Sequence, residues 1–272
     1  MSLLEVKNLV IVDNKSKQNL VENINFKLGK NMCLGIVGES RSGKTITAKA
    51  ILGLLSCNLK INGSIIFNDN IELLKIKKNE LRKIRGQKIC MILQNAMSSF
   101  DPLYTIGYQM VETLVENKGI TKNRAKEISI EYLEKMNINN TRDVIKKYPH
   151  QLSGGMLQRC MIALAISMKP DIIIADEPTT ALDSINQKEV VEQLKKIREL
   201  IGTSLIFISH DLGIVKYLAQ DVLVMKDGKQ VEYATSREVF NNPKHEYTKY
   251  LINTRLDITN SFNMYVNKEV AV

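Results

Sequence analysis

The sequence has 272 residues, of which 44% are hydrophobic and 25% are charged, and its formal net charge is +9. This composition is ordinary for a folded globular chain and excludes a collagen-like, low-complexity or disordered protein. Its apolar stretches, such as Cys160 to Ile166, fall well short of the ~20 residues that span a bilayer, so we expect no transmembrane segment.

The four cysteines, at positions 33, 57, 90 and 160, are scattered and form no C-x-x-C pair. We expect reduced, mostly buried thiols in a cytosolic protein rather than a zinc or disulfide framework. The N-terminus, MSLLEVKNLVIV, has no basic leader and does not resemble a secretion signal. The basic residues are spread along the chain, which favours solvated surface lysines over a nucleic-acid-binding patch.

The first predicted elements are two strands, Leu3 to Val12 and Ile24 to Leu28, which alternate apolar and polar residues on either side of a polar turn. We expect them to form an antiparallel edge that leads into a third, apolar strand from Met32 to Val37.

The sequence GESRSGKT follows this third strand directly and precedes a helix-like segment, Ile46 to Leu55. It matches G-x-x-x-x-G-K-[ST], in which backbone N–H groups and the helix dipole face a phosphate. We therefore expect a di- or triphosphate ligand, with Lys44 at the terminal phosphates and the Thr45 hydroxyl on Mg²⁺. The predicted phosphate-binding residues are Gly38, Glu39, Ser40, Arg41, Ser42, Gly43, Lys44 and Thr45.

After a strand at Ile61 to Phe67 and a short helix at Asn79 to Arg85, a buried strand is predicted from Lys88 to Leu93, ending at Gln94. From Asp101 to about Tyr148 the pattern changes to helical spacing without strand-like runs. This change predicts a helical insertion.

A second helix start suited to anions follows the insertion, in the stretch LSGGMLQR. Ser153 is a good N-cap for the helix that runs to Met168, and Gly154 and Gly155 let another molecule approach the exposed N–H groups.

Two carboxylates stand at the end of the next apolar strand, Ile172 to Ala175. Ligands bind at the carboxyl ends of strands in open α/β sheets. We expect Asp176 to hold Mg²⁺ and Glu177 to orient the attacking water as a base.

The last third predicts a helix at Gln187 to Leu200, a strand at Ser204 to Ile208 and a hairpin across Asp227-Gly228. His210 follows the strand, and this position favours a phosphate contact over a structural role. The chain from about Asn253 is polar and weakly patterned.

Taken in order, GESRSGKT, Gln94, LSGGMLQR, IIIADEPTTALD and SHD resemble the nucleotide-binding subunit of an ABC transporter. The resemblance implies an α/β P-loop NTPase fold, with a RecA-like core sheet, an antiparallel β edge and an inserted helical subdomain. It implies one ATPase domain over residues 1–252, with the insertion at about 101–168 and a tail at 253–272.

The same resemblance implies ATP and Mg²⁺ as cofactors and two subunits that meet head to tail. ATP would lie between the P-loop of one subunit and Ser153 to Gly155 of the other. Gln94 would sense Mg²⁺ and the attacking water, Glu177 would be the catalytic base, Asp183 would cross the interface, and His210 would contact the γ-phosphate. The implied partners are membrane permease subunits docked near residues 94–102, at the cytoplasmic face of the membrane.

A narrower resemblance is to the peptide/nickel importer group, carried by QNAMSSFDPLYTIG, by the methionine of LSGGMLQR and by PKHEYT at Pro243 to Thr248. The chain ends without a cysteine-containing tail, and Leu157 also resembles nickel or metal-chelate subunits more than oligopeptide ones. The resemblance implies that two different ATPase subunits usually pair in such systems, so both a homodimer and a heterodimer stay open. An extracytoplasmic solute-binding protein is an indirect partner.

The site departs from the family pattern in two places. Arg41 occupies a loop position that is usually glycine, where it either strains the backbone or adds a cationic group. No aromatic residue stands near Val12 to Lys15, where the family stacks adenine, so base selectivity could be weak.

Two other functions compete with import. A soluble ABC ATPase acting on ribosomes or DNA would commonly carry two cassettes or a long coiled coil, and this chain shows one cassette and no sustained heptads. Export is the second alternative. Only the resemblance of Asp101 to Gly107 and Pro243 to Thr248 to importer subunits argues against it. We therefore expect no nucleic-acid partner.

Overall fold

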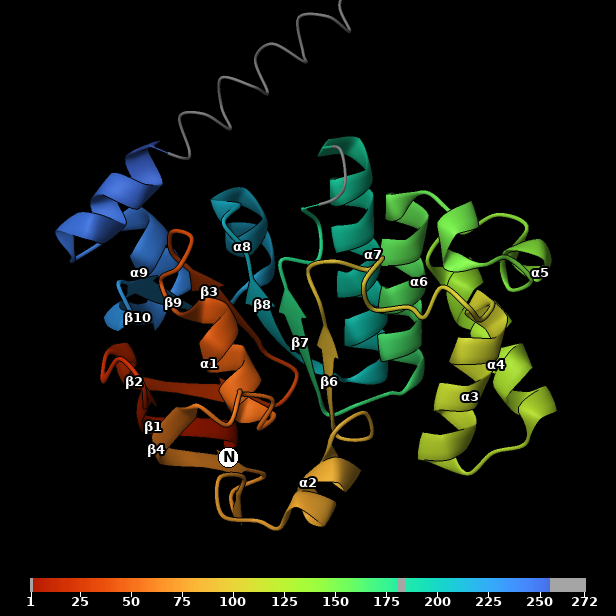
Figure 1. The fold of residues 1–272 in the computed structure, drawn as a ribbon. Helices are drawn as coiled ribbons and strands as arrows, with labels where there is room; N and C mark the ends of the chain where they lie inside the picture. The colour runs from red at the N-terminus through yellow and green to blue at the C-terminus, as the bar shows by residue number, and fades with distance from the viewer. Residues whose placement is uncertain (1, 181–183, 255–272) are drawn as a thin grey trace, which may run out of the picture. The chain divides into compact units, whose positions relative to one another are not determined.

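The computed structural model describes residues 2–180 and 184–254. The chain divides into two compact units: Met1–Lys75 with Phe207–Val272 form the first unit, and Ile76–Ile206 form the second. The boundary falls inside one strand, β8 (Ser204–Ile208). Both units combine sheet and helix, as expected for an α/β chain (Figure 1). Among the described residues, no helix is long and apolar enough to cross a membrane.

The strands of the first unit lie side by side in the order β5-β4-β1-β2-β10-β9-β3. The antiparallel strands predicted around the first polar turn are confirmed, because β1 pairs with β2 and β4 in this orientation. Their inward-facing apolar side chains, such as those of Val6, Leu9 and Ile11, are fully buried. These strands are β1 (Ser2–Asp13), β2 (Asn19–Gly29), β4 (Leu59–Phe67) and the short β5 (Ile71–Glu72).

The strand that leads to the phosphate loop, β3 (Cys33–Val37), is buried along its whole length and runs parallel to β9 (Asp221–Lys226). The hairpin predicted across Asp227-Gly228 is confirmed, since β9 pairs antiparallel with β10 (Lys229–Thr235). The hairpin stands between β2 and β3 in the sheet. The antiparallel edge therefore leads into β3 along the chain but does not pair with it.

Helices of the first unit are α1 (Lys44–Ile51), α8 (Leu212–Leu218), α9 (Ser236–Asn241) and a further one over residues 246–254. Helix α8 packs closely on β3. A Cβ added at Gly35 of the strand would lie only 2.4 Å from Cγ1 of Val215 in the helix. The sequence analysis predicted neither α8 nor α9, which have only seven and six residues.

In the second unit β6 (Ile89–Ile92) and β7 (Ile172–Asp176) pair in parallel, and the N–H of Ser204 in β8 donates to the Asp171 carbonyl at 3.0 Å. Beside these strands the unit contains α2 (Lys78–Ile84) and α7 (Ser184–Ile201). Burial raises the pKa of the Cys90 and Cys160 thiols to about 12 in each case, which keeps both protonated. Together with the buried Cys33, they confirm the prediction of mostly buried thiols.

The remaining helices of the second unit lie within the predicted insertion at residues 101–168 (Figure 1). Thr105 and Thr121 cap the first two, each accepting a backbone N–H three residues ahead. Helix α4 contacts α3, α5 and α6. The elements are α3 (Ile106–Lys118), α4 (Lys122–Lys135), α5 (Thr141–Val144), the 3₁₀ turn η1 (Pro149–Gln151) and α6 (Gly154–Ser167).

Candidate functional site

The loop between β3 and α1 is shaped by two glycines that no other residue could replace without strain. Gly38 has φ +151°, and a Cβ there would lie 2.1 Å from the Met225 carbonyl oxygen. Gly43 has φ +96° and caps α1 without a side-chain hydrogen bond. The loop therefore folds tightly against its own unit, and no side chain caps the start of α1.

Lys44 is the buried cation of this loop, with only 6% of its surface exposed. Its Nζ donates to the carbonyl oxygens of Gly38 at 2.8 Å and Glu39 at 2.7 Å, and to Oγ of Ser42 at 3.4 Å. The ammonium is thus held over the loop by the loop's own acceptors, where it can meet an incoming phosphate.

Arg41 lies at the exposed part of the loop with φ +69°, a left-handed conformation that glycine adopts without cost. The strain expected for a side chain at this position is therefore present in the backbone. The neighbouring Ser40 is also exposed, whereas Thr45 is half-buried in the first turn of α1.

His210 lies in the same unit, at the end of β8. The N–H of the preceding Ser209 donates to the Ile36 carbonyl of β3 at 3.3 Å, so the chain leaves β8 next to the end of β3. Asp211 then caps α8, accepting from the N–H groups of Gly213 and Ile214. His210 itself is exposed. The first unit thus brings His210 to the sheet edge from which the phosphate loop rises.

The second unit joins Gln94 and Glu177, which are 83 residues apart in sequence, by a hydrogen bond of 3.1 Å from Nε2 to Oε2. The parallel register of β6 and β7 explains the contact, because Ile92 pairs with Ala175 and both strands end at one edge. Asp176 is 4% exposed, and Glu177 adopts φ +47°, an uncommon conformation that turns the chain away from the strand.

The start of α6, unlike the start of α1, is capped by a side chain. Ser153 caps the helix, with its Oγ accepting the N–H of Met156 at 3.2 Å. Ser153 and Gly154 are exposed, and a Cβ added at Gly154 would meet no atom within 4 Å. Further along α6, Arg159 donates to Oε2 of Glu189 at 2.9 Å and fastens the helix to α7.

The predicted site residues thus fall into two groups that the structure describes separately. The first unit holds Gly38 to Thr45 and His210, and the second holds Gln94, Asp176, Glu177 and Ser153 to Gly155. Asp183 lies outside the described residues.

One residue at the phosphate loop was missed by the sequence reasoning. The hydroxyl of Tyr247 accepts the N–H of Glu39 at 3.1 Å, although 208 residues separate them. PKHEYT, which contains Tyr247, was singled out as a family-like motif but had been given no role.

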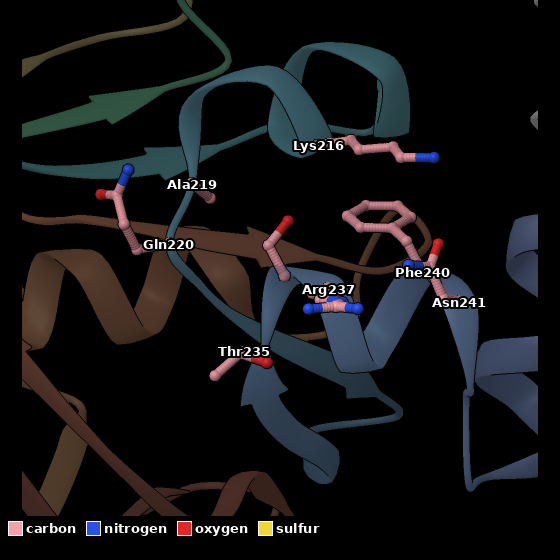
Figure 2. Close-up of a pocket in the computed structure, with 8 residues that line it drawn as sticks. Lys216, Ala219, Gln220, Thr235, Arg237, Phe240 and Asn241 are labelled. Carbon is pink, nitrogen blue, oxygen red and sulfur yellow. The ribbon is translucent and has the colours of Figure 1, made fainter.

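A pocket of about 440 Å³ lies between α8 and α9 (Figure 2). Lys216 stands above the ring of Phe240 at 5.7 Å, and Arg237 supplies a second cation. None of the predicted phosphate-binding or catalytic residues lines this pocket. We therefore assign it no part in the site.

The ABC transporter family profile matches residues 21–180, from β2 through the phosphate loop and the helical insertion to the segment after Glu177. The chain belongs to the ABC transporter family. This ABC ATPase has the α/β fold of P-loop NTPases predicted from its motifs, and it is an ATP-binding and ATP-hydrolysing enzyme.

Relatives of this ABC ATPase include importer subunits. The metal-staphylopine import system ATP-binding protein CntD of Staphylococcus aureus is 43% identical over 99% of both chains. The dipeptide transport ATP-binding protein DppD of Lactococcus lactis is 41% identical over 97% of this chain and 77% of its own length. The predicted resemblance to the peptide/nickel importer group is confirmed.

Among solved structures, the dimeric ATP-binding cassette MJ0796 in a post-hydrolysis state, bound to ADP and Pi, is 26% identical with a TM-score of 0.77. The match covers 86% of this chain and 99% of that one.

Proposed function

We propose that this ABC ATPase powers the import of a small solute, and that the solute is a metal chelate such as a nickel complex rather than an oligopeptide. The observation that carries the choice is the similarity to the metal-staphylopine subunit, which extends over 99% of both chains. The dipeptide subunit has nearly the same identity, but only 77% of its length is matched.

In the proposed reaction Lys44 binds the terminal phosphates of ATP, and the N–H groups at the start of α1 surround them. Glu177 accepts a proton from the attacking water, while Gln94, hydrogen-bonded to Glu177, orients that water. His210 contacts the γ-phosphate as its charge develops. The hydrogen bond between Gln94 and Glu177 supports this pairing.

Mg²⁺ would be held by Thr45, Gln94 and Asp176. A hydroxyl, a carboxylate and an amide carbonyl are the hard oxygen donors that Mg²⁺ prefers, so this donor set fits the ion. Within residues 2–180 and 184–254, no group of three or more His, Cys, Asp or Glu side chains offers a competing metal site. The ion supplies charge neutralisation of the β- and γ-phosphates.

The partner across ATP is proposed to be a second ABC ATPase subunit, identical or different, that presents Ser153 to Gly155 to this chain's phosphates. Gly154 has open space around it, which leaves room for such an approach. Asp183 would cross the same interface.

Permease subunits at the cytoplasmic face of the membrane are proposed to dock near residues 94–102. Large apolar side chains are exposed along and just beyond this segment, with Met97 at 48%, Leu103 at 77% and Tyr104 at 47%. Such exposure is typical of a contact surface for another protein. Through the permease, an extracytoplasmic binding protein would select the solute.

The solute is tested in proteoliposomes that contain this subunit with its permease and solute-binding protein. A binding protein loaded with a nickel chelate should stimulate ATP hydrolysis, and one offered oligopeptides should not. Complexes carrying Glu177→Gln provide the background rate. Stimulation by oligopeptides alone would reject the metal-chelate assignment and leave the ATPase assignment intact.

A further inference from the structure

The PKHEYT motif forms a turn that is anchored by one buried carboxylate. Glu232 of β10 is 8% exposed, and its two oxygens accept the N–H groups of Lys244 at 3.0 Å and His245 at 3.1 Å. Nδ1 of His245 in turn accepts the N–H of Tyr247 at 3.1 Å. These bonds fix the start of the helix over residues 246–254 and therefore the direction of the Tyr247 side chain.

Tyr247 is 6% exposed and lies against the hairpin that flanks the phosphate loop. The Nζ of Lys226, at the end of β9, lies 4.9 Å from the centre of its ring. With the ring held in this way, the hydroxyl accepts the N–H of Glu39 at 3.1 Å. A residue near the C-terminus thus bonds directly to the backbone of the loop.

The bonded peptide unit, between Gly38 and Glu39, is the same one that receives Lys44. Its carbonyl oxygen accepts Nζ of Lys44 at 2.8 Å, and its N–H donates to the Tyr247 hydroxyl. Gly38 has φ +151°, where glycine has wide conformational freedom, so the peptide plane needs both bonds to keep one orientation. Its orientation places one of the three acceptors that hold the Lys44 ammonium, beside the Glu39 carbonyl and the Ser42 hydroxyl.

We propose that Tyr247 is a positioning residue for ATP binding, which orients the Gly38–Glu39 peptide and through it places Lys44 at the phosphates. This inference rests on the assignment of Gly38 to Thr45 as the phosphate loop. It gives the PKHEYT motif a role in the ATPase cycle, because the turn held by Glu232 supplies the acceptor for the Glu39 N–H from outside the loop.

The test is a double-mutant cycle on ATP affinity with the full-length chain. Tyr247→Phe keeps the ring and its contact with Lys226 but removes the acceptor, and it should weaken ATP binding about three- to tenfold. In a Lys44→Ala background the same substitution should change ATP affinity by less than about twofold, because the ammonium that Tyr247 positions is gone. This measurement needs titration to millimolar ATP. Tyr250→Phe is the matched control, since Tyr250 lies on the same helix and is 58% exposed.

Thermal unfolding of each variant separates loss of fold from loss of positioning. The role of Tyr247 would be overturned if Tyr247→Phe bound ATP as tightly as wild type. It would also be overturned if the substitution weakened ATP binding by the same factor in the presence and in the absence of Lys44. Wild-type protein that failed to bind ATP would instead contradict the phosphate-loop assignment.

Discussion

Two helix starts in this chain face phosphates in the proposed mechanism, and they are built in opposite ways. The start of α1 has a left-handed glycine cap without a side-chain bond, and its loop is closed by its own chain, with the Met225 carbonyl only 2.1 Å from a Cβ built on Gly38. The start of α6 has an ordinary serine cap, and a Cβ on Gly154 would contact nothing.

The two glycines, Gly38 and Gly154, therefore differ in the reason for which a side chain is missing. Gly38 is required by crowding and by its φ angle within the folded chain. Neither reason applies at Gly154, where we propose that the missing side chain makes room for a second subunit. In the proposed mechanism the α1 start and its loop bind the phosphates of ATP within one chain, whereas the α6 start contacts ATP bound by a second subunit.

The largest expected effect comes from Glu177→Gln, which removes the proposed base but keeps the size of the side chain. We expect ATP turnover to fall by about 10²- to 10⁴-fold with ATP binding retained. ATP should then hold the two helix starts of different subunits together, seen as a stable ATP-dependent dimer by light scattering. Glu127→Gln, at an exposed position of α4, is the control, and normal hydrolysis by Glu177→Gln would exclude Glu177 as the base.

The next effect separates the two glycines directly. Gly154→Ala should leave the thermal midpoint unchanged or slightly higher, because alanine favours helix. It should reduce ATP turnover by roughly tenfold or more, since a displaced partner misplaces the reacting groups. Gly38→Ala should instead destabilise the fold by about 1–3 kcal/mol. A Gly154→Ala enzyme with full turnover would remove the contrast.

A smaller effect is expected at Arg41, which tests how far the α1 cradle tolerates a side chain. Wild type should bind ATP, and Arg41→Gly should bind within about fivefold of it, because an exposed ionic contact contributes at most about 1 kcal/mol. Isothermal titration of wild type, Arg41→Gly and Arg41→Lys separates charge from backbone strain. Wild-type protein that fails to bind while Arg41→Gly binds would show that the strained loop is defective.

The smallest effect concerns the PKHEYT turn, which Glu232 holds and which carries Tyr247 to the phosphate loop. Burial raises the pKa of Glu232, but hydrogen bonds, including those from the N–H groups of Lys244 and His245, outweigh it and lower the pKa below the ordinary 4.5. A lowered pKa means that this carboxylate stabilises the fold above pH 4.5 and loses that contribution as the pH falls through the folded value.

Glu232→Gln should therefore cost about 1 kcal/mol at pH 7, because one amide oxygen replaces two carboxylate acceptors. The difference from wild type should shrink as the pH falls from 4.5 through the lowered folded pKa of Glu232, because the wild-type carboxylate then becomes protonated. Calorimetry between pH 3 and pH 7 measures this, with exposed Glu246→Gln as the control. A constant difference across that range would show that the carboxylate charge is irrelevant to the turn.

Much of the fold was predictable because its signals are local. The capped helices α3 and α4 and the β9–β10 hairpin show their period or turn residues directly. Short helices such as α8 and α9 were missed, because their form depends on packing rather than on a repeating pattern. The position of the hairpin between β2 and β3 was also missed, since strand order is a matter of long-range pairing.

The features of the candidate site also divide into those with a local sequence signal and those that depend on long-range contacts. The sequence by itself predicted the phosphate loop, the Ser153 helix start and the two carboxylates at the end of β7, because residue type and spacing carry that chemistry along the chain. Only the tertiary structure decided that Gln94 meets Glu177 and that Tyr247 holds the loop at Glu39. Both contacts join residues far apart in sequence, and parallel pairing and the packing of the C-terminal turn alone bring them together.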